Sequence, residues 1–275
     1  MSVAREGPAG RPAPTAGRPG KVWFVGAGPG SHDLLTVRAL RVLARADVVL
    51  HDALVPAQIL RWAPAAVLVP VGKRCDRPST GQRDIDRALV EAARRHASVV
   101  RLKGGDPAVF GRLDEEIDAL QAAGIAWEVV PGVTAASAAA AAAGQSLTRR
   151  GDARRVTIVT PRNGRGEPDN DRWADGLDEH GTIVLYMAGR VAASCAQVLL
   201  DRGFGPDVPV VAVRAASLPG QDVRWTTLAG MRAGFFDDGQ PVALLVGRAL
   251  TDRRRAAVRS GATPRRPTRT EPAMF

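Results

Sequence analysis

From Lys21 onward, the chain alternates short runs of β-branched residues with longer segments of helical periodicity. Such alternation is the pattern of parallel strands joined by crossover helices. The most regular helical segment follows Thr80, which offers an N-cap, and it places Ile85, Leu89 and Ala92 on one face. The sequence therefore predicts an α/β fold made of two series of strands and helices.

The two series meet near Gly132, where a Pro-Gly turn precedes an alanine-rich segment. We expect a disordered lead over 1–20, an N-terminal α/β domain over 21–132, a C-terminal α/β domain over 133–250 and a basic disordered tail over 251–275. In the first domain, strands are expected over 22–25, 47–51, 67–71, 99–103 and 125–130, with helices over 36–45, 57–62 and 114–123 besides the one after Thr80. In the second, helices over 135–143 and 192–201 accompany strands over 156–160, 182–187, 208–213, 223–227 and 242–246.

Composition and charge limit the classes of function. Of the 275 residues 45% are hydrophobic, which is typical of a globular protein, whereas eight of the first twenty residues are glycine or proline. The formal net charge of +10 lies mostly in the flanks, since 251–275 contributes +5 and 1–20 contributes +2. Solvated charged ends explain this excess better than a nucleic-acid site does.

The cysteines and the hydropathy pattern bear on the cellular compartment. Cys75 and Cys195 cannot form a disulfide framework. The sequence also lacks a stretch of roughly 20 apolar residues, as a membrane helix needs, and the apolar core of a signal peptide. We therefore expect a cytoplasmic protein.

A glycine-rich turn, Gly26-Ala-Gly-Pro-Gly-Ser31, follows the first expected strand. A dinucleotide-binding fingerprint would need glycine at Ser31 and a free N–H where Pro29 stands. The turn is therefore a poor cradle for a diphosphate, but it is rigid and brings bare backbone close to a ligand. A purely structural turn explains the motif equally well.

Two further turns follow the strands expected over 99–103 and 125–130. Lys103-Gly-Gly-Asp-Pro107 joins adjacent glycines, which let a ligand approach the backbone, to Asp106, whose carboxylate would accept hydrogen bonds from hydroxyl groups. Pro131-Gly-Val-Thr-Ala135 opens a helix. If the strands are parallel, the three turns lie at one carboxyl edge, where open α/β sheets bind ligands.

Two strands of the same half end in ionisable residues, His51-Asp52 and Gly72-Lys73-Arg74. An acid and a lysine beside glycine turns are candidates for proton transfer, and a surface ion pair is the plainer explanation. No Ser-His-Asp arrangement or Walker loop is evident. The four histidines lack the spacing of metal ligands, so no metal is expected.

Taken together, these motifs resemble one family, the tetrapyrrole methylases, and within it the members that methylate carbon atoms of uroporphyrinogen III. The resemblance implies a two-domain α/β protein, usually a homodimer, with S-adenosylmethionine in the cleft between the domains. The segments that carry it occur in family order over 21–250 and are Val25-Gly-Ala-Gly-Pro-Gly30, Leu34-Leu-Thr36, Ala46-Asp-Val-Val-Leu-His-Asp52, Val71-Gly-Lys-Arg74, Val100-Arg-Leu-Lys-Gly-Gly-Asp-Pro107, Val129-Val-Pro-Gly-Val-Thr134 and Leu185-Tyr-Met187.

The resemblance also implies a reaction and the residues that perform it. Two methyl groups would pass to carbons 2 and 7 of uroporphyrinogen III, giving precorrin-2 for siroheme or cobalamin synthesis and S-adenosylhomocysteine as by-product. Asp52 would accept a proton, and Lys73 would donate one. The implied cofactor contacts are Pro29, Gly104, Gly105, Asp106, Val109, Thr134, Ala135, Met187 and Ala216.

The substrate carries eight carboxylates, and arginine binds a carboxylate through paired hydrogen bonds. Candidates for this contact are the loop arginines Arg74, Arg77, Arg149, Arg150 and Arg154. The chain departs from the family in several loops, where Leu113-Asp114 replaces a Gly-Gly pair, Pro78 and Arg149 replace histidines, and Thr160-Pro-Arg162 lacks a Gly-His. These departures bear on the tetrapyrrole and the methylated position more than on the cofactor.

Several alternatives stay open. Within the methyltransferases they are a later precorrin C-methyltransferase of the cobalamin pathway and an rRNA methyltransferase of the same fold, to which the arginine-rich tail would contribute. A nicotinamide oxidoreductase would use Asp47, about 20 residues past the first glycines, as its ribose ligand. A non-catalytic binding module is the last alternative. The partners expected are a small tetrapyrrole and a second copy of the chain, without membrane or nucleic acid.

Overall fold

The computed structural model describes residues 19–72, 81–162, 171–234 and 241–251. The chain divides into two compact units, which we call unit 1 (Met1–Ala142 with Val213–Asp222) and unit 2 (Ala143–Ala212 with Val223–Phe275). The boundary expected near Gly132 precedes this division by ten residues, because helix α5 (Ala135–Ala143) groups with unit 1 almost to its end.

Unit 1 is built on a five-stranded, wholly parallel sheet in the order β3-β2-β4-β1-β5. The register pairs Gly26 with Lys103 and His51 with Leu102, so three of the strands end at nearly the same level. The α/β fold class predicted from the sequence is confirmed. The strands are β1 (Lys21–Gly26), β2 (Val48–His51), β3 (Val67–Pro70), β4 (Ser98–Lys103) and β5 (Trp127–Val130).

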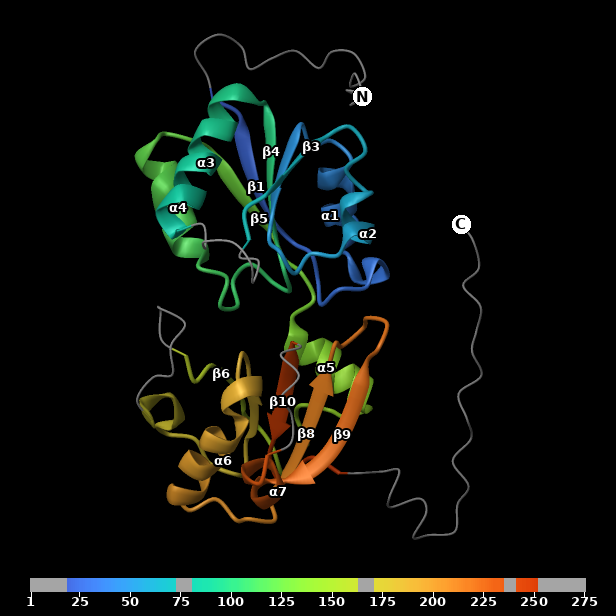
Figure 1. Cartoon of the computed structure of the whole chain (residues 1–275), viewed down its shortest axis with the longest axis vertical. Coiled ribbons are helices and arrows are strands. Elements are labelled where there is room, and N and C mark those ends of the chain that lie inside the picture. Colours follow the sequence, from blue (N-terminus) through green and yellow to red (C-terminus); the bar gives the residue numbers. More distant parts are fainter. Residues whose placement is uncertain (1–18, 73–80, 163–170, 235–240, 252–275) are drawn as a thin grey trace, which may run out of the picture. The chain divides into compact units, whose positions relative to one another are not determined.

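Helices cover both faces of this sheet (Figure 1). Successive side chains of a strand point to opposite faces, and Val49 therefore packs with α1 and α2 while Val48 and Leu50 pack with α3 and α4. Each face is thus closed by its own apolar cluster. The helices are α1 (Val37–Leu43), α2 (Ala57–Leu60), α3 (Gln82–Arg95) and α4 (Leu113–Ala122), with the 3-10 turn η1 (His32–Leu34) before α1.

The helix ends follow local signals in the sequence. α1 begins after Thr36, whose hydroxyl oxygen accepts a hydrogen bond from Ala39 N at 3.1 Å. α3 buries Ile85 and Leu89, as its periodicity predicted, whereas Ala92, the third residue of the predicted face, is half-buried and Ala93 is buried. Gly81 takes the N-cap position of α3, and Thr80, the expected cap, lies outside the described residues.

Unit 2 contains a mixed five-stranded sheet in the order β6-β7-β10-β8-β9, in which β6 is parallel and β10 antiparallel to β7. Its core joins the sheet to α6 and α7, for example through Leu199, Met231 and Leu244. The sequence predicted the five strands and α6 but not the short α7. The elements are β6 (Val156–Val159), η2 (Asp171–Ala174), β7 (Thr182–Leu185), η3 (Gly189–Val191), α6 (Ala192–Asp201), β8 (Pro209–Arg214), β9 (Asp222–Thr227), α7 (Leu228–Arg232) and β10 (Val242–Val246).

Across the described ranges, no helix has the length and apolar character needed to span a membrane.

Candidate active site

Three backbone turns meet at the carboxyl edge of the unit 1 sheet. Gly28 and Gly105 exchange two hydrogen bonds, from Gly28 N to Gly105 O at 3.1 Å and from Gly105 N to Gly28 O at 2.8 Å. Gly132 closes the group, since a Cβ placed on it would overlap the Gly105 carbonyl oxygen and come within 2.8 Å of the Gly26 Cα. The turns predicted to share one edge therefore do so, and glycine is needed because their backbones touch.

Asp106 joins two of these turns. Its Oδ1 accepts a hydrogen bond from Ala108 N at 2.8 Å, and its Oδ2 accepts one from Gly132 N at 2.9 Å. The sequence suggested that this carboxylate faces a ligand's hydroxyl groups. In the structure it first ties the second turn to the third, and only its remaining lone pairs are left for a ligand.

A fourth segment, residues 215–218 after β8, packs on the first turn. Ser31 N donates a hydrogen bond to Ser217 Oγ at 3.1 Å, and a Cβ on Gly30 would lie 2.6 Å from the Leu218 side chain. Ala215 and Ser217 have φ values of 46° and 67°, a left-handed conformation that non-glycine residues adopt at an energetic cost and that is enriched at functional sites. This packing brings the segment that contains Ala216 to the turn that contains Pro29.

The second turn presents bare backbone to open space. A Cβ on Gly104 or on Gly105 would meet nothing within 4 Å, although Gly105 has a φ of +65°. Gly104 is exposed, and Val109, five residues further on, is half-buried. At this edge, the side of each glycine where a side chain would stand is therefore open, which leaves room for a ligand to approach the backbone closely.

A group of charged side chains lies beneath this edge, and we call Asp52, Arg101, Lys103 and Glu116 the Arg101 cluster. Arg101 donates from Nε to Glu116 Oε1 at 3.1 Å, and its Nη2 lies 2.6 Å from Asp52 Oδ1. Lys103 Nζ donates to Glu116 Oε2 at 2.9 Å. The Arg101 and Glu116 side chains are 3% and 1% exposed, whereas Asp52 is 31% exposed.

The cluster is electrically balanced, because two cations face two carboxylates. Burial, and then the nearby Arg101 cation, lowers the pKa of the Lys103 ammonium. The sequence analysis identified Asp52 but missed the other three residues. The available signal was the pair of cations at alternate positions of β4, which places both on the face of the sheet that carries α4.

Unit 1 holds most of the residues implied by the resemblance. The four segments at its carboxyl edge contain Pro29, Gly104, Gly105, Asp106, Val109, Thr134, Ala135 and Ala216, with Asp52 at the end of β2. Lys73, Arg74 and Arg77 lie outside the described residues.

The other implied residues lie in unit 2. Met187 follows β7 with a left-handed φ of 56°, is 49% exposed, and accepts a hydrogen bond at its carbonyl oxygen from Arg162 Nε at 3.0 Å. Arg149 is already paired, with Asp152 at 3.4 Å and with Thr251 Oγ1 at 2.9 Å. Arg150 and Arg154 are exposed.

One proposed alternative fails on geometry. Asp47 Oδ2 accepts a hydrogen bond from Ser98 N at 2.8 Å, at the start of β4. The carboxylate is therefore at the amino edge of a parallel sheet, opposite the glycine turns, and cannot bind the ribose of a dinucleotide held by them.

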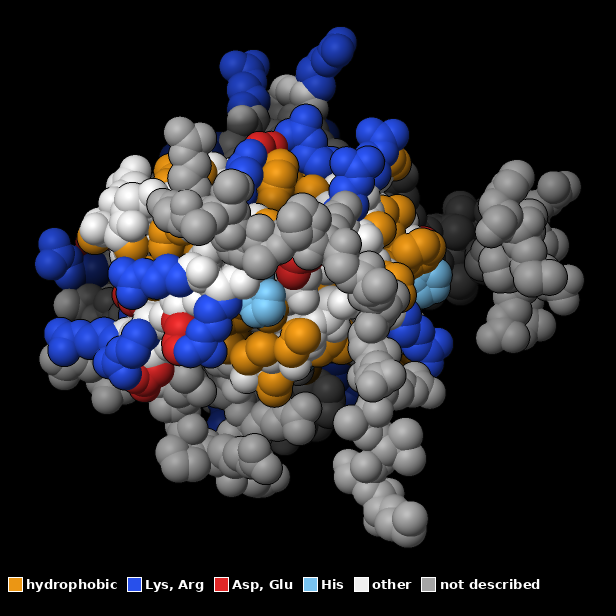
Figure 2. All heavy atoms as spheres, turned by 90° about the horizontal axis from the view of Figure 1, so that it is seen from above, with side chains coloured by type: hydrophobic (Ala, Val, Ile, Leu, Met, Phe, Trp, Pro, Cys, Tyr) orange, Lys and Arg blue, Asp and Glu red, His pale blue; other side chains and the backbone are white. Residues whose placement is uncertain are grey.

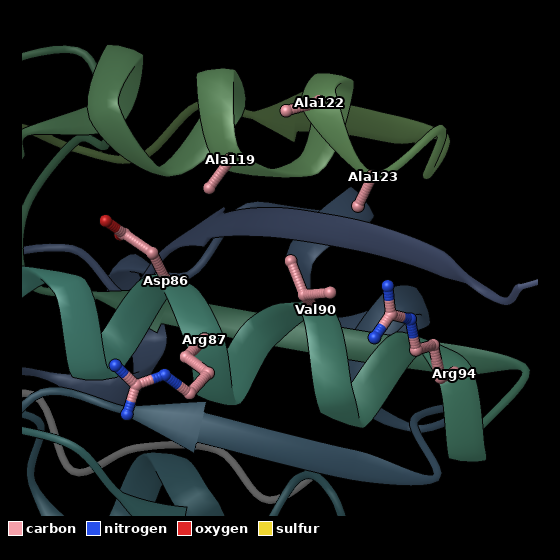
Figure 3. A pocket seen from close by; sticks show the side chains of 7 residues that line it. All are labelled: Asp86, Arg87, Val90, Arg94, Ala119, Ala122 and Ala123. Atoms are coloured by element: carbon pink, nitrogen blue, oxygen red, sulfur yellow. The ribbon is translucent and has the colours of Figure 1, made fainter.

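An open hollow of about 350 Å³ lies between α3 and α4, outside the turns (Figure 3). It exists because α4 presents alanines there, and its polar groups do not converge: Asp86 points toward α4, while the guanidinium of Arg87 points away. Burial raises the pKa of the Asp86 carboxyl. Its lining contains no residue of the glycine turns and consists of Asp86, Arg87, Val90, Arg94, Ala119, Ala122 and Ala123.

Surface charge gives no sign of a broad nucleic-acid site on the face in view in Figure 2. There, lysine and arginine side chains occur in small groups separated by hydrophobic, acidic and uncharged atoms. Within the part of the chain that the structure describes, no group of three or more His, Cys, Asp or Glu residues is placed to hold a metal ion.

Comparison with known proteins identifies the family. The profile of the Tetrapyrrole (Corrin/Porphyrin) Methylases matches residues 21–231. The chain is 40% identical over 244 residues to the uroporphyrinogen-III C-methyltransferase of Paracoccus denitrificans, with 88% of this chain and 85% of that protein covered. It is 42% identical over 237 residues to the siroheme synthase of Gluconacetobacter diazotrophicus, but spans only 50% of that protein's length, and the same share of the Chromobacterium violaceum siroheme synthase.

Solved structures agree with this result. A uroporphyrin-III C-methyltransferase from Thermus thermophilus, complexed with S-adenosyl homocysteine, has a TM-score of 0.73 and 37% identity, covering 84% of this chain and 98% of that one. A cobalt precorrin-4 methyltransferase has a TM-score of 0.69 and 30% identity, covering 84% and 96%. The chain therefore belongs to the tetrapyrrole methylases.

Proposed function

We propose that this protein is an S-adenosylmethionine-dependent uroporphyrinogen-III C-methyltransferase, which methylates carbons 2 and 7 to give precorrin-2. The observation that carries the proposal is the match to the Paracoccus denitrificans enzyme of that name, which extends over most of both chains. The higher TM-score and identity of the uroporphyrin-III enzyme favour this substrate over a later precorrin.

We infer that the unit 1 turns hold the S-adenosylmethionine molecule. The open space where Gly104 and Gly105 would carry a Cβ leaves room for a ligand beside the backbone, and four chain segments meet there. We infer that Pro29, Val109, Thr134, Ala135 and Ala216 line the same site. Met187, which the resemblance also implies as a cofactor contact, belongs to unit 2. S-adenosylmethionine supplies an electrophilic methyl group on a sulfonium.

The residues of the chain have two tasks in this reaction. An electron-rich pyrrole carbon would take the methyl group directly as its bond to sulfur breaks and S-adenosylhomocysteine leaves, so the protein needs to orient the reactants more than to supply a nucleophile. The methylated ring must then lose a proton, and the partly exposed Asp52 carboxylate serves as the acceptor. Lys73 remains the proposed donor, and Arg74, Arg77, Arg149, Arg150 and Arg154 remain proposed contacts for the substrate carboxylates.

Anaerobic incubation with S-adenosylmethionine and uroporphyrinogen III, followed by mass analysis, tests the function. We expect a tetrapyrrole heavier by two methyl groups, together with S-adenosylhomocysteine. Cofactor binding without methylation of this substrate would contradict the proposal and direct attention to a later precorrin. RNA retention that falls steeply with salt would instead support an rRNA substrate.

We also propose that the enzyme is a cytoplasmic homodimer, as expected for a member of this family. Light scattering coupled to size-exclusion chromatography should give twice the chain mass of 29.0 kDa. A mass equal to that of one chain would contradict the dimer.

A further inference from the structure

The Arg101 cluster has a geometry that stability alone does not require. Every guanidinium nitrogen of Arg101 is used, since Nε contacts Glu116, Nη2 contacts Asp52 and Nη1 donates to the Leu102 carbonyl at 3.3 Å. Taking such charges out of water is costly, and apolar side chains of similar volume stabilise a core equally well or better. The arrangement therefore calls for a second role.

That role is visible in the orientation of Asp52. Its Oδ1 is held by Arg101 at 2.6 Å, while Oδ2 lies 3.4 Å from Gly104 N, at the turn with the uncovered backbone. Among the members of the cluster, Asp52 alone is substantially exposed, at 31%. The buried cation thus holds Oδ1, while Oδ2 accepts a hydrogen bond from Gly104 N at the glycine turn.

The anchor of Arg101, Glu116, is buried and contacts two cations. Glu116 is in the first turn of α4, where the helix dipole favours a negative charge, and each of its oxygens contacts a different cation. Lys103 balances the second oxygen, so Arg101 is not pulled away from Asp52. A chain of contacts therefore runs from α4 through β4 to the end of β2.

We propose that Arg101, anchored by Glu116, is a positioning residue that sets the Asp52 carboxylate for proton acceptance. The inference rests on the proposed function, in which Asp52 is the proton acceptor. Arg101 does not touch substrate in this scheme and acts only through Asp52. Lysine at position 101 would keep the charge but lose the planar fork that contacts both carboxylates at once.

The test compares R101K, D52N, the double variant R101K/D52N and E116Q in the full-length protein. We expect R101K to lower kcat by about 10- to 100-fold, because a displacement of about 1 Å costs that much, with the Kd of S-adenosylhomocysteine changed less than about twofold. Because Arg101 acts through Asp52, the double variant should be no slower than D52N. E116Q, which keeps the side-chain shape, should lower kcat by about tenfold and serves if R101K does not fold.

V99A is the matched control for destabilisation. Val99 lies on the same strand and the same face of the sheet as Arg101, is fully buried, and pairs with Val48, four residues before Asp52. We expect V99A to lower the melting temperature while keeping the wild-type kcat.

Three results would overturn the inference. The first is a kcat of R101K equal to that of the wild type, or the same result for E116Q if only that variant folds. The second is a double variant whose kcat falls by the product of the factors measured for R101K and D52N alone, and the third is a kcat of V99A that falls as far as that of R101K. Absence of methyl transfer by the wild-type protein would instead refute the proposed function, and this inference with it.

Discussion

Gly104 allows the proposed cofactor site to be tested without disturbing the fold. A Cβ at this position meets nothing within 4 Å, and its φ lies outside the left-handed region, so alanine fits the backbone as it stands. Replacing such a glycine restricts the unfolded chain and stabilises a protein by about 0.4–1 kcal/mol. We therefore expect G104A to unfold at an equal or slightly higher temperature than the wild type.

Cofactor binding should respond in the opposite direction. If S-adenosylmethionine occupies the space above Gly104, the added methyl must be accommodated inside a filled site, and such overpacking costs about 1–3 kcal/mol. Since 1.4 kcal/mol corresponds to a factor of ten, the Kd of S-adenosylhomocysteine should rise about 5- to 150-fold. Isothermal titration calorimetry measures this directly, and thermal unfolding of the same samples gives the stability.

Two other glycines provide the comparison. Gly132 has no room for a Cβ, so G132A should lower both stability and affinity. Gly124 has a φ of +69° and ends α4 away from the turns, so G124A should lower stability but leave affinity unchanged. A wild-type Kd in G104A would refute the placement of the cofactor over this turn, and a lower melting temperature would refute the argument from free space.

Three further predictions follow from single contacts. D106N replaces one carboxylate oxygen, an acceptor, with an NH₂ group that faces the backbone N–H of Ala108 or Gly132. We expect it to lower the free energy of unfolding, measured by urea denaturation, by about 1–3 kcal/mol. An unchanged free energy would contradict the role of Asp106 in joining the two turns. The pKa of Glu179 is lowered chiefly by the hydrogen bond that Arg248 donates to its carboxylate. The stability that this ionised carboxylate adds is therefore present above the pKa of Glu179 in the unfolded chain and is lost as the pH falls through its pKa in the folded protein. E179Q should therefore lose less stability than the wild type between pH 6 and pH 3, and parallel curves would contradict this. Cys195 is 2% exposed, and burial raises its thiol pKa to about 12, so iodoacetamide followed by peptide mapping should label it only after denaturation, and labelling in the native protein would contradict its burial.

The sequence was sufficient for the fold because its signals are local. Thr36 caps α1 through its own neighbour Ala39, and Ile85 and Leu89 face the core at helical spacing. The same is true of the glycine turns, which stand directly after strands whose parallel order brings their ends together. At these positions the local structural preference of the sequence agrees with the tertiary structure, as is typical of sequences that fold to one structure.

The site was predicted only where its residues stand in turns. Arg101 and Lys103 occur inside a strand, where sequence alone does not distinguish a buried cation from an exposed one, and their partner Glu116 comes from a separate helix. Asp106 was recognised, but its bond to Gly132, 26 residues away, depends on how closely two turns approach. Such contacts are long-range, and spacing along the chain does not encode them.

One strand, β4, supplies both features of the candidate site. Arg101 and Lys103 point to the α4 side, and the next two residues are the uncovered glycines Gly104 and Gly105. A slip of β4 by one residue would turn both cations toward the opposite face, into the apolar core that packs against α1 and α2. Two unpaired buried charges would cost more than the sheet gains from any alternative pairing. We therefore expect the Arg101 cluster also to favour the register that pairs Lys103 with Gly26, and so to keep the glycine turn in position.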